Sequence, residues 1–595
     1  MRILRWFSRF FVWLFATVGA VVMIGGIVAA VIAVSRPAPE LPSRMILSLD
    51  LSGGIVDTRD DDPWEQLGGD PPNYLRRIVD SIIAAKDDPR VLGLALRLHG
   101  DRLKLAHVQE LRDAISKFKA SGKWSTAHAA TFSGVADYLA AASTGAVSMR
   151  PSGTVGVTGV ALAFPHIRDT LETIGVEAQI EQRHEFKSAA ETFTRSQMSE
   201  PARLSWGAIA NSWFGQIVSL MASDRNMSEA QVRAVIDGAP HLGEDGLKNG
   251  LVDTLQYWDQ FAAKQRNRDG EAALFVSVAS YAAALEDVAQ EDGSDGEPTR
   301  IALIHGAGPV VDSRNDAELG QDVLAADRIA AAIRKIAKDE TIDGLILRID
   351  SPGGGYGASD SVRRAVKLAR ESGKSVVASL GAVAASGGYF IAMGADRIVA
   401  QPATLTGSIG VFGGKMVLSE LWRKLGVNWS QIRVGAQAGM WSPHWPFEPG
   451  AQARRKAILD HIYNDFAAKA AADRDLDKAG IDAAARGRVW TGEDALGIGL
   501  VDRLGGLSTA VTEMKLVLGL KDDAPIVLVA RPAPRSPFER VLEIVKDGGS
   551  PFTAVRSLMA SIRTGTAWPG WVGRAMGGLS GQEGVLQLPP YQSSL

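Results

Sequence analysis

The stretch GLILRIDS (344–351) is a run of large apolar residues that ends in Asp350 and Ser351, and it indicates a buried strand. A closely similar stretch, GLALRLHG (93–100), occurs 251 residues earlier. Helical patterns such as ASDSVRRAVKLARES (358–372) alternate with these apolar runs. This alternation predicts an α/β fold with a largely parallel sheet, whose sites lie in the loops at the carboxyl ends of the strands.

The offset of about 250 residues recurs along much of the chain. It relates Tyr138 to Tyr389, and the sequence GLVD occurs both at 250–253 and at 499–502. Solenoid repeats have periods of only about 20–50 residues, so this longer period indicates two tandem copies of one domain.

Changes in composition mark the borders of these copies. RPAPELPS (36–43) is a proline-rich spacer, and QEDGSDGEPT (290–299) is an acidic linker. We expect the tryptophan-bearing helices near the C-terminus to pack against protein rather than against a membrane. The predicted segments are a stub (1–9), an anchor (10–35), a linker (36–44), the first repeat (45–289), a linker (290–299), the second repeat (300–520) and a C-terminal extension (521–595).

The N-terminal segment predicts one transmembrane helix. Residues 10–35 carry no charge and, at about 1.5 Å per residue, can cross a hydrocarbon core of roughly 30 Å. A cleaved signal peptide is the alternative, but its apolar region runs only about 7–15 residues. Arg2, Arg5 and Arg9 precede the span, which predicts a cytoplasmic N-terminus. The bulk of the chain is then expected on the periplasmic side of a bacterial inner membrane.

Composition narrows the chemistry. The 595 residues carry a formal net charge of −3, so the chain has no electrostatic reason to bind nucleic acid. Cysteine is absent and the nine histidines lack metal-ligand spacing, so neither a thiol nucleophile nor a metal or other cofactor is expected. Hydrolytic chemistry is left to Ser, Thr, Asp, Glu, His or Lys.

Two loops of the second repeat carry the candidate chemistry. SPGGG (351–355) places glycines after one strand, and GAVAASGGYFI (381–391) places Ser386 among small residues at the start of a predicted helix. A tight turn and a helix cap are the structural alternatives for these motifs. The first repeat has Val135 at the position of Ser386, so it keeps the scaffold without the hydroxyl. This difference between the copies favours a chemical role for Ser386.

Three motifs identify a resemblance to a known family. DSPGGG (350–355), GAVAASGGYFIA (381–392) and TLTGSIGVFG (404–413) closely resemble the signal peptide peptidase A family of serine proteases, in its long tandem-repeat form. This family belongs to the fold group of the Clp proteolytic subunit and the crotonases, and the resemblance covers roughly residues 1–520. It implies a Ser/Lys dyad that degrades cleaved signal peptides and other hydrophobic peptides, in a homo-tetrameric ring.

The resemblance also implies roles for individual residues. Ser386 is the expected nucleophile, and Lys187, within EFKSAAETFTRSQMS (185–199), is the expected base. Ser408 of TGSIG is expected to orient that lysine. The expected oxyanion donors are the amide of Gly387 and the amide of either Gly353 or Gly354.

Lys187 fits the duplicated architecture. The repeat register places Ala438 opposite Lys187, so the first copy has a base without a nucleophile and the second has the reverse. To act as a base the lysine must be neutral, so its pKa has to fall from about 10.4 to about 7–8 through burial. Its small and apolar neighbours suit this requirement. His184 is the competing base.

Two other functions are weighed against a peptidase. A crotonase-like acyl-CoA enzyme would share the glycine loops, but it would need cytosolic CoA and normally catalytic carboxylates. A catalytically inactive, membrane-anchored scaffold would bind peptides without cutting them, which the set of Ser386, Lys187 and Ser408 opposes. We therefore expect a peptidase whose extended substrates pair with an exposed strand edge.

Overall fold

The computed structural model describes residues 40–57, 73–100, 103–291, 298–313, 323–532, 585–588 and 592–594. The predicted anchor (10–35) lies outside these residues. Within them, no helix combines the length and the apolar character that crossing a membrane requires.

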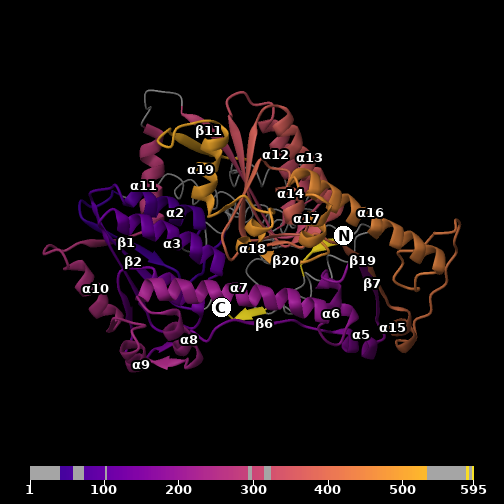
Figure 1. Ribbon diagram of the computed structural model, residues 1–595, viewed down its shortest axis with the longest axis horizontal. Coiled ribbons are helices and arrows are strands. Elements are labelled where there is room, and N and C mark those ends of the chain that lie inside the picture. Colours follow the sequence, from indigo (N-terminus) through magenta and orange to yellow (C-terminus); the bar gives the residue numbers. More distant parts are fainter. Residues whose placement is uncertain are drawn as a thin grey trace, which may run out of the picture.

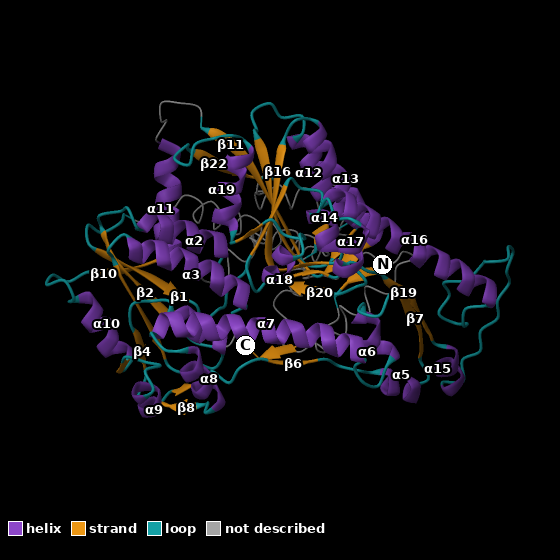
Figure 2. Ribbon diagram, in the orientation of Figure 1, coloured by secondary structure: helices purple, strands orange, loops and turns teal. Residues whose placement is uncertain are grey.

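The first copy is built on a six-stranded sheet in which all neighbouring strands are parallel (Figures 1 and 2). Helix α2 (Leu75–Ala85) buries Leu75, Ile78, Val79 and Ile82, the one-sided spacing expected of a helix that covers a sheet. In spatial order the strands are β10 (Leu274–Ser277), β1 (Met45–Asp50), β2 (Val91–Leu98), β3 (Trp124–Ala129), β4 (Val147–Met149) and β9 (Thr254–Leu255).

The second copy is built on an eight-stranded sheet, parallel except where its edge strand β20 runs antiparallel to β18. The prediction of α/β architecture with largely parallel sheets is therefore confirmed. The strands are β20 (Val489–Thr491), β18 (Leu405–Gly407), β16 (Ser375–Ala385), β14 (Gly344–Ser351), β11 (Thr299–Ala307) and β22 (Ile526–Ala530), with β17 (Arg397–Ala400) and β21 (Arg503–Leu504) beside β16.

The remaining elements cover these sheets or connect them. In the first copy they are α3 (Leu105–Ala120), α4 (Val135–Ala142), β5 (Thr154–Val155), β6 (Ala161–Ala163), α5 (Arg168–Ile174), η2 (Ser188–Ala190), α6 (Glu191–Thr194), α8 (Glu229–Asp237), β8 (His241–Leu242), α9 (Gly243–Lys248), α10 (Trp258–Arg266) and α11 (Val278–Glu291). In the second copy and after it they are α12 (Ala326–Ile336), α13 (Tyr356–Glu371), α14 (Gly387–Ala392), α15 (Ser419–Lys424), α16 (Pro449–Asp473), α17 (Lys478–Ala484), α18 (Gly492–Gly497), α19 (Leu507–Val517) and β24 (Gln592–Ser594).

The repeated positions make repeated contacts. The Tyr138 hydroxyl donates a hydrogen bond to the Leu251 carbonyl at 2.8 Å, and the Tyr389 hydroxyl donates one to the Leu500 carbonyl at 3.0 Å. Both tyrosines are fully buried. The same buried phenol, satisfied by the carbonyl of the shared GLVD motif, supports the interpretation of the chain as two copies of one domain.

A third sheet joins the two copies. Its strand β7 (Glu177–Gln182) belongs to the first copy and runs antiparallel to β19 (Phe412–Val417) of the second, from Glu177 opposite Val417 to Gln182 opposite Phe412. The other strands of this sheet are β13 (Leu324–Ala325), β12 (Val310–Val311), β15 (Gly353–Gly355) and β23 (Val585–Gln587).

The long helix α7 (Glu200–Arg225) runs beneath both copies (Figure 1). The hydroxyl of Ser199 caps its N-terminus by accepting a hydrogen bond from the Ala202 amide, and Asn226 ends it in the left-handed conformation. The Trp213 indole on this helix donates to the Ala403 carbonyl of the second copy at 3.0 Å. The helix therefore ties the copies together along its length.

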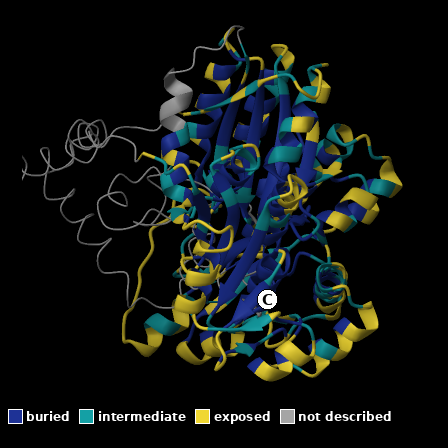
Figure 3. Cartoon of the chain, turned by 90° about the vertical axis from the view of Figure 1, so that its left-hand side faces the viewer, coloured by how far each residue is buried: buried dark blue, intermediate teal, exposed yellow. Residues whose placement is uncertain are grey.

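The hydrophobic core of the first copy also continues into the second. Ala385 and Leu405 of the second copy belong to the same buried cluster as the strands of the first sheet. Figure 3 shows these central strands as buried and the outer helices with exposed faces. The two copies are thus packed as one body rather than joined only by a linker.

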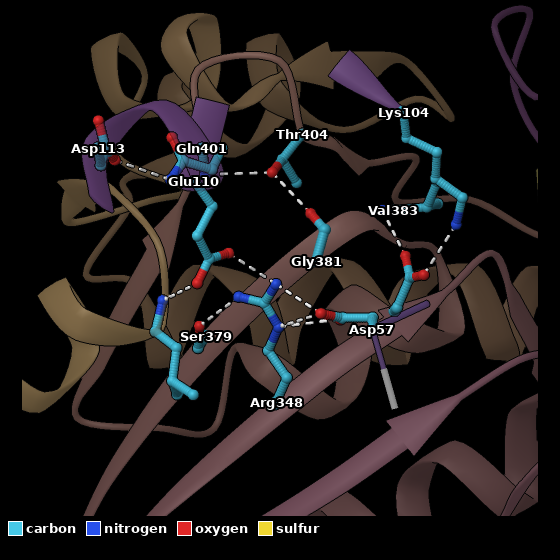
Figure 4. A network of polar contacts seen from close by, with 12 residues as sticks. Asp57, Lys104, Glu110, Asp113, Arg348, Ser379, Gly381, Val383, Gln401 and Thr404 are labelled. Carbon is cyan, nitrogen blue, oxygen red and sulfur yellow. Dashed lines mark hydrogen bonds and ion pairs between the residues drawn. The ribbon is translucent and has the colours of Figure 1, made fainter. Parts of the chain in front are cut away.

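At the centre of this contact lies a buried ionic network around Arg348 of β14 (Figure 4). Its guanidinium binds Asp57 at 2.8 and 2.9 Å, Glu110 at 2.9 Å and the Ser379 hydroxyl at 2.9 Å. The side chains of Arg348, Asp57 and Glu110 are only 2–4% exposed. Glu110 also accepts a hydrogen bond from the Leu507 amide at 2.6 Å. Both acids come from the first copy and the arginine from the second.

Arg348 stabilises its two acids unequally. Burial alone would raise the pKa of Asp57, but the charge and hydrogen bonds of Arg348 lower it well below its usual range. Burial raises the pKa of Glu110, and Arg348 offsets this only in part. The ionised pair of Arg348 and Asp57 is therefore a fully buried charge contact between the copies.

We predict that Arg348→Met destabilises the protein by about 3–5 kcal/mol, because it leaves two buried carboxylates without their counter-ion. Arg97 occupies the matching position of the first copy, but its ion pair with Asp50 is about half exposed at 3.5 Å. Arg97→Met is therefore the matched control, with an expected loss of about 1 kcal/mol or less. Denaturant unfolding of both variants tests this, and equal losses would contradict it.

Candidate active site

Ser386 stands at a sharp turn between β16 and α14. Its backbone angles are φ 55° and ψ −113°, in a region that non-glycine residues rarely adopt. The turn is held by two hydrogen bonds: the Ser386 amide donates to the Gly407 carbonyl at 2.7 Å, and the Ser386 carbonyl accepts from Phe390 at 2.8 Å. The strained turn presents the hydroxyl at the end of a central strand.

The two glycines after Ser386 are required by close packing. A Cβ atom on Gly387 would lie 2.7 Å from the Ser359 hydroxyl and 2.9 Å from the Gly354 nitrogen. A Cβ atom on Gly388 would lie 2.8 Å from the Ser351 carbonyl oxygen. The small residues of the SGG motif therefore let the serine turn rest directly against the glycine loop at 351–355.

Lys187 reaches Ser386 from the first copy. After β7, the Arg183 amide donates to the Val411 carbonyl at 2.8 Å and the Phe186 amide to the Arg486 carbonyl at 3.3 Å, which fixes the chain as it enters the second copy. The Lys187 side chain is 1% exposed. Its Nζ lies 2.6 Å from the Ser386 Oγ. The structure thus brings together two residues that are 199 positions apart.

Ser408 completes the surroundings of the amine. The Lys187 Nζ lies 3.0 Å from the Ser408 hydroxyl and 3.0 Å from the Ser408 carbonyl oxygen. A neutral amine has two N–H donors and one lone pair, so it can donate to both Ser408 oxygens while it accepts the proton of the Ser386 hydroxyl. The backbone of Ser408 is in the left-handed region, with φ 53°. Its amide donates a hydrogen bond to the Arg488 carbonyl at 2.8 Å, which fixes the position of Ser408 beside the lysine.

The electrostatics favour the neutral lysine. Burial lowers the pKa of Lys187 well below its ordinary value of 10.5, and no carboxylate contributes to the shift. A charged amine here would face only hydroxyl and carbonyl oxygens in a dry site. The desolvation that the sequence analysis required of a lysine base is therefore present.

Two glycines that the sequence analysis did not single out make room for this lysine. Gly487 has φ 84°, and a Cβ atom there would lie 2.5 Å from the backbone nitrogen of Lys187. A Cβ atom on Gly410 would lie 3.2 Å from the Lys187 Cδ. Gly410 lies in the TGSIG motif and could have been found there. Gly487 has a counterpart at Gly238 in the repeat register, so the difference between the copies gave no reason to select it.

The glycine loop lies beside the serine, as expected, but its amides differ. Gly353 has φ 105°, and its amide donates to the Ser351 hydroxyl at 3.2 Å. Gly354 packs against β12, where a Cβ atom would lie 2.0 Å from the Val310 carbonyl oxygen. The Gly387 amide belongs to the first turn of α14, whose N–H groups have no acceptor within the helix.

His184, the competing base, does not contact Ser386. It is exposed, has φ 64° and packs its ring against Tyr463 with the ring centroids 4.1 Å apart. Lys187 is therefore the basic side chain that contacts the serine.

One cluster in the described part of the chain has the spacing of a metal site, namely Asp57, His107 and Asp350. Arg348 already binds both oxygens of Asp57, and the Lys104 Nζ lies 3.0 Å from Asp350. These cations balance the carboxylates, so we assign no metal to the cluster.

Comparison with known proteins shows the family of the chain. The model of peptidase family S49 matches residues 117–270 and 368–521, once in each copy. Protease 4 of Haemophilus influenzae is 28% identical over 82% of both chains, and Protease 4 of Salmonella typhi is 30% identical over the same shares.

A solved structure of a ClpP1 mutant from Listeria monocytogenes aligns with 35% of this chain and 94% of its own at 12% identity, with a TM-score of 0.23. The family match and the similarity to Protease 4 extend over most of the chain. The chain therefore belongs to peptidase family S49 and is a serine peptidase with two copies of the family's domain.

Proposed function

We propose that the chain is a Ser/Lys-dyad endopeptidase in which Ser386 is the nucleophile and Lys187 the general base. The observation that carries this proposal is the 2.6 Å contact between the Lys187 Nζ and the Ser386 Oγ in a dry site. The neutral amine takes the hydroxyl proton as the Ser386 oxygen attacks the carbonyl carbon of a peptide bond. The resulting ammonium then gives the proton to the leaving amine. In the second step Lys187 takes a proton from water, the water oxygen attacks the acyl carbon, and the proton returns to the Ser386 oxygen as the acyl group leaves.

The developing oxyanion needs donors on the side of the glycine loop. The Gly387 amide is well suited, since it is an unshared N–H at a helix start beside the nucleophile. Of the two loop glycines we favour Gly354 as the second donor, because the Gly353 amide is already bound to the Ser351 hydroxyl. Ser408 orients Lys187 through the two 3.0 Å contacts and does not touch the substrate.

The proposed substrates are cleaved signal peptides and other hydrophobic peptides in extended conformation. One similar protein, from Enterococcus faecium, bears the name putative signal peptide peptidase SppA. The third sheet, which runs past the dyad, supports binding by strand pairing. The family membership speaks against the acyl-CoA enzyme, and the complete dyad speaks against a scaffold that only binds peptides.

We also propose that this enzyme lies on the periplasmic face of an inner membrane, anchored by residues 10–35, as a homo-tetramer. The uncharged N-terminal segment supports the anchor. The segment 427–434 supports an oligomer, because its Ile432 and Val434 side chains are 99% and 93% exposed. Exposed apolar side chains of this kind commonly mark contacts between subunits.

We predict that a fluorophosphonate probe labels the wild-type protein and does not label Ser386→Ala. Lys187→Ala should react about 10²–10⁴-fold more slowly, because a general base contributes about that factor. Lys374→Ala is the matched control: this lysine also donates to two backbone carbonyls, but far from the dyad, and labelling should be unchanged. Normal labelling of Lys187→Ala would contradict the dyad and favour another base.

We predict a specific pH dependence for Lys187. Peptidase activity should rise with pH until the lysine is neutral, at a pKa below 10.5. Between that pKa and about 10.4 the unfolded chain binds more protons than the folded one, so the lysine makes stability rise with pH in this window. The free energy of unfolding of the wild type should therefore increase, relative to Lys187→Met, as pH rises through this window. A difference that does not change with pH would show an unshifted lysine.

We predict that the full chain, expressed in a bacterium, stays with the membrane fraction after an alkaline carbonate wash. Deletion of residues 1–39 should move it to the soluble fraction, because the uncharged segment is removed. Retention of the shortened chain on membranes would contradict an N-terminal anchor and would point to another membrane contact.

A further inference from the structure

A short strand from the C-terminal extension lies in the sheet that joins the two copies. Strand β23 runs antiparallel to the glycine strand β15, with Gly353 opposite Gln587, Gly354 opposite Leu586 and Gly355 opposite Val585. On its other side it meets β19, where Phe412 lies opposite Val585. The strand therefore fills the position between β15 and β19.

This position runs past the nucleophile. A Cβ atom on Gly387 would lie 2.9 Å from the Gly354 nitrogen and 3.2 Å from the Gly353 Cα, so β15 lies directly against the residue that follows Ser386. On the other side, β19 pairs with β7, the strand that leads to Lys187. A strand between β15 and β19 is thus bordered on one side by the strand that packs against the Ser386 turn, and on the other by the strand that pairs with β7, which leads to Lys187.

The contact is of a kind that another peptide could reproduce. The three residues of β15 are glycines, so β23 pairs with backbone groups and meets no side chain of that strand. The next residue, Leu588, donates its amide to the Pro352 carbonyl at 3.0 Å and is 5% exposed, packed with the core of the first copy. Backbone hydrogen bonds with an apolar side chain in a buried position are the recognition mode of added strands.

The C-terminal tail, residues 585–595, also makes a second contact, with the first copy. Strand β24 runs antiparallel to β6 of the first copy, with Ser594 opposite Ala161 and Gln592 opposite Ala163 (Figure 1). The C-terminal residues therefore contact both copies: β23 pairs with the glycine loop of the second copy, and β24 pairs with a strand of the first. This second contact keeps β23 close to its position between β15 and β19.

We propose that residues 585–588 occupy the position of an extended peptide substrate, so that the C-terminal tail is a tethered competitor of substrate. This proposal rests on the proposed peptidase function and adds a regulatory ligand to the same site. Because the tail is covalently attached, its effective concentration is high although its strand is short. A substrate binds only when β23 has left, and its apparent affinity is reduced by the fraction of time the position is free.

The test compares the full chain with two variants that release the tail. One lacks residues 585–595, and the other is Leu588→Asp, which places a carboxylate where an apolar side chain is buried. Leu588→Met is the matched control, because it conserves volume and apolar character. For a tail that leaves the position free about a tenth of the time, both variants should lower KM for a hydrophobic fluorogenic peptide about tenfold without changing kcat. Leu588→Met should keep the KM of the full chain.

A second measurement adds the tail in trans. A synthetic peptide of residues 585–594 should inhibit Leu588→Asp competitively and inhibit the full chain about tenfold more weakly. A fluorescent form of this peptide should bind the double variant Ser386→Ala/Leu588→Asp more tightly than it binds Ser386→Ala. Because both proteins lack Ser386, this binding is measured without any catalysis. Equal KM values for the full chain and both variants, or equal peptide binding by the two Ser386→Ala proteins, would overturn the proposal.

These outcomes are separate from those of the peptidase assignment. If no variant is labelled by the fluorophosphonate but peptide binding tightens when the tail is released, the dyad is contradicted. The claim that the tail occupies the substrate position is then still supported. Normal labelling with an unchanged KM would support the dyad and overturn the proposed role of the tail as a competitor of substrate. Thermal unfolding of each variant is the control that separates a change in KM from loss of the fold.

Discussion

The contact between the Lys187 amine and the Ser386 hydroxyl depends on delivery of the amine, dry and uncharged, from one copy of the domain to the other. Each part of the architecture serves this delivery. The pairing of β7 with β19 brings the lysine segment across, and Gly410 and Gly487 leave room for its side chain. The Arg348 network and α7 hold the copies in one arrangement. A shift of about 1 Å between the copies would break the 2.6 Å contact between Lys187 and Ser386.

Much of this organisation could be predicted from the sequence because it follows from residue patterns. The apolar run at 344–351 and its copy at 93–100 predicted the parallel strands and the duplication. The loss of the serine in the first copy singled out Ser386, and the resemblance of three motifs added Lys187 and Ser408. The structure places these three side chains together, although their roles in catalysis stay proposals until they are tested.

Other features could not be predicted, because they depend on how distant segments meet. Arg97 and Arg348 occupy equivalent places in the repeat, but one is half exposed and the other is the buried centre of the interface. Gly487 is needed because its backbone has φ 84° and because the Lys187 backbone passes against it. Strand β23 lies far along the chain from β15, and no motif in the C-terminal extension indicated where it would bind.

The protonation state of Lys187 in the resting enzyme tests most directly whether this lysine is the general base. Lysines carrying ¹³C at Cε can be titrated by NMR, and the Lys187 signal is identified by its absence from Lys187→Met. If Lys187 is the neutral base, its signal already has the shift of a neutral amine at a pH well below 10.5. A signal that titrates near 10.5, with the other lysines, would contradict the assignment of Lys187 as the base.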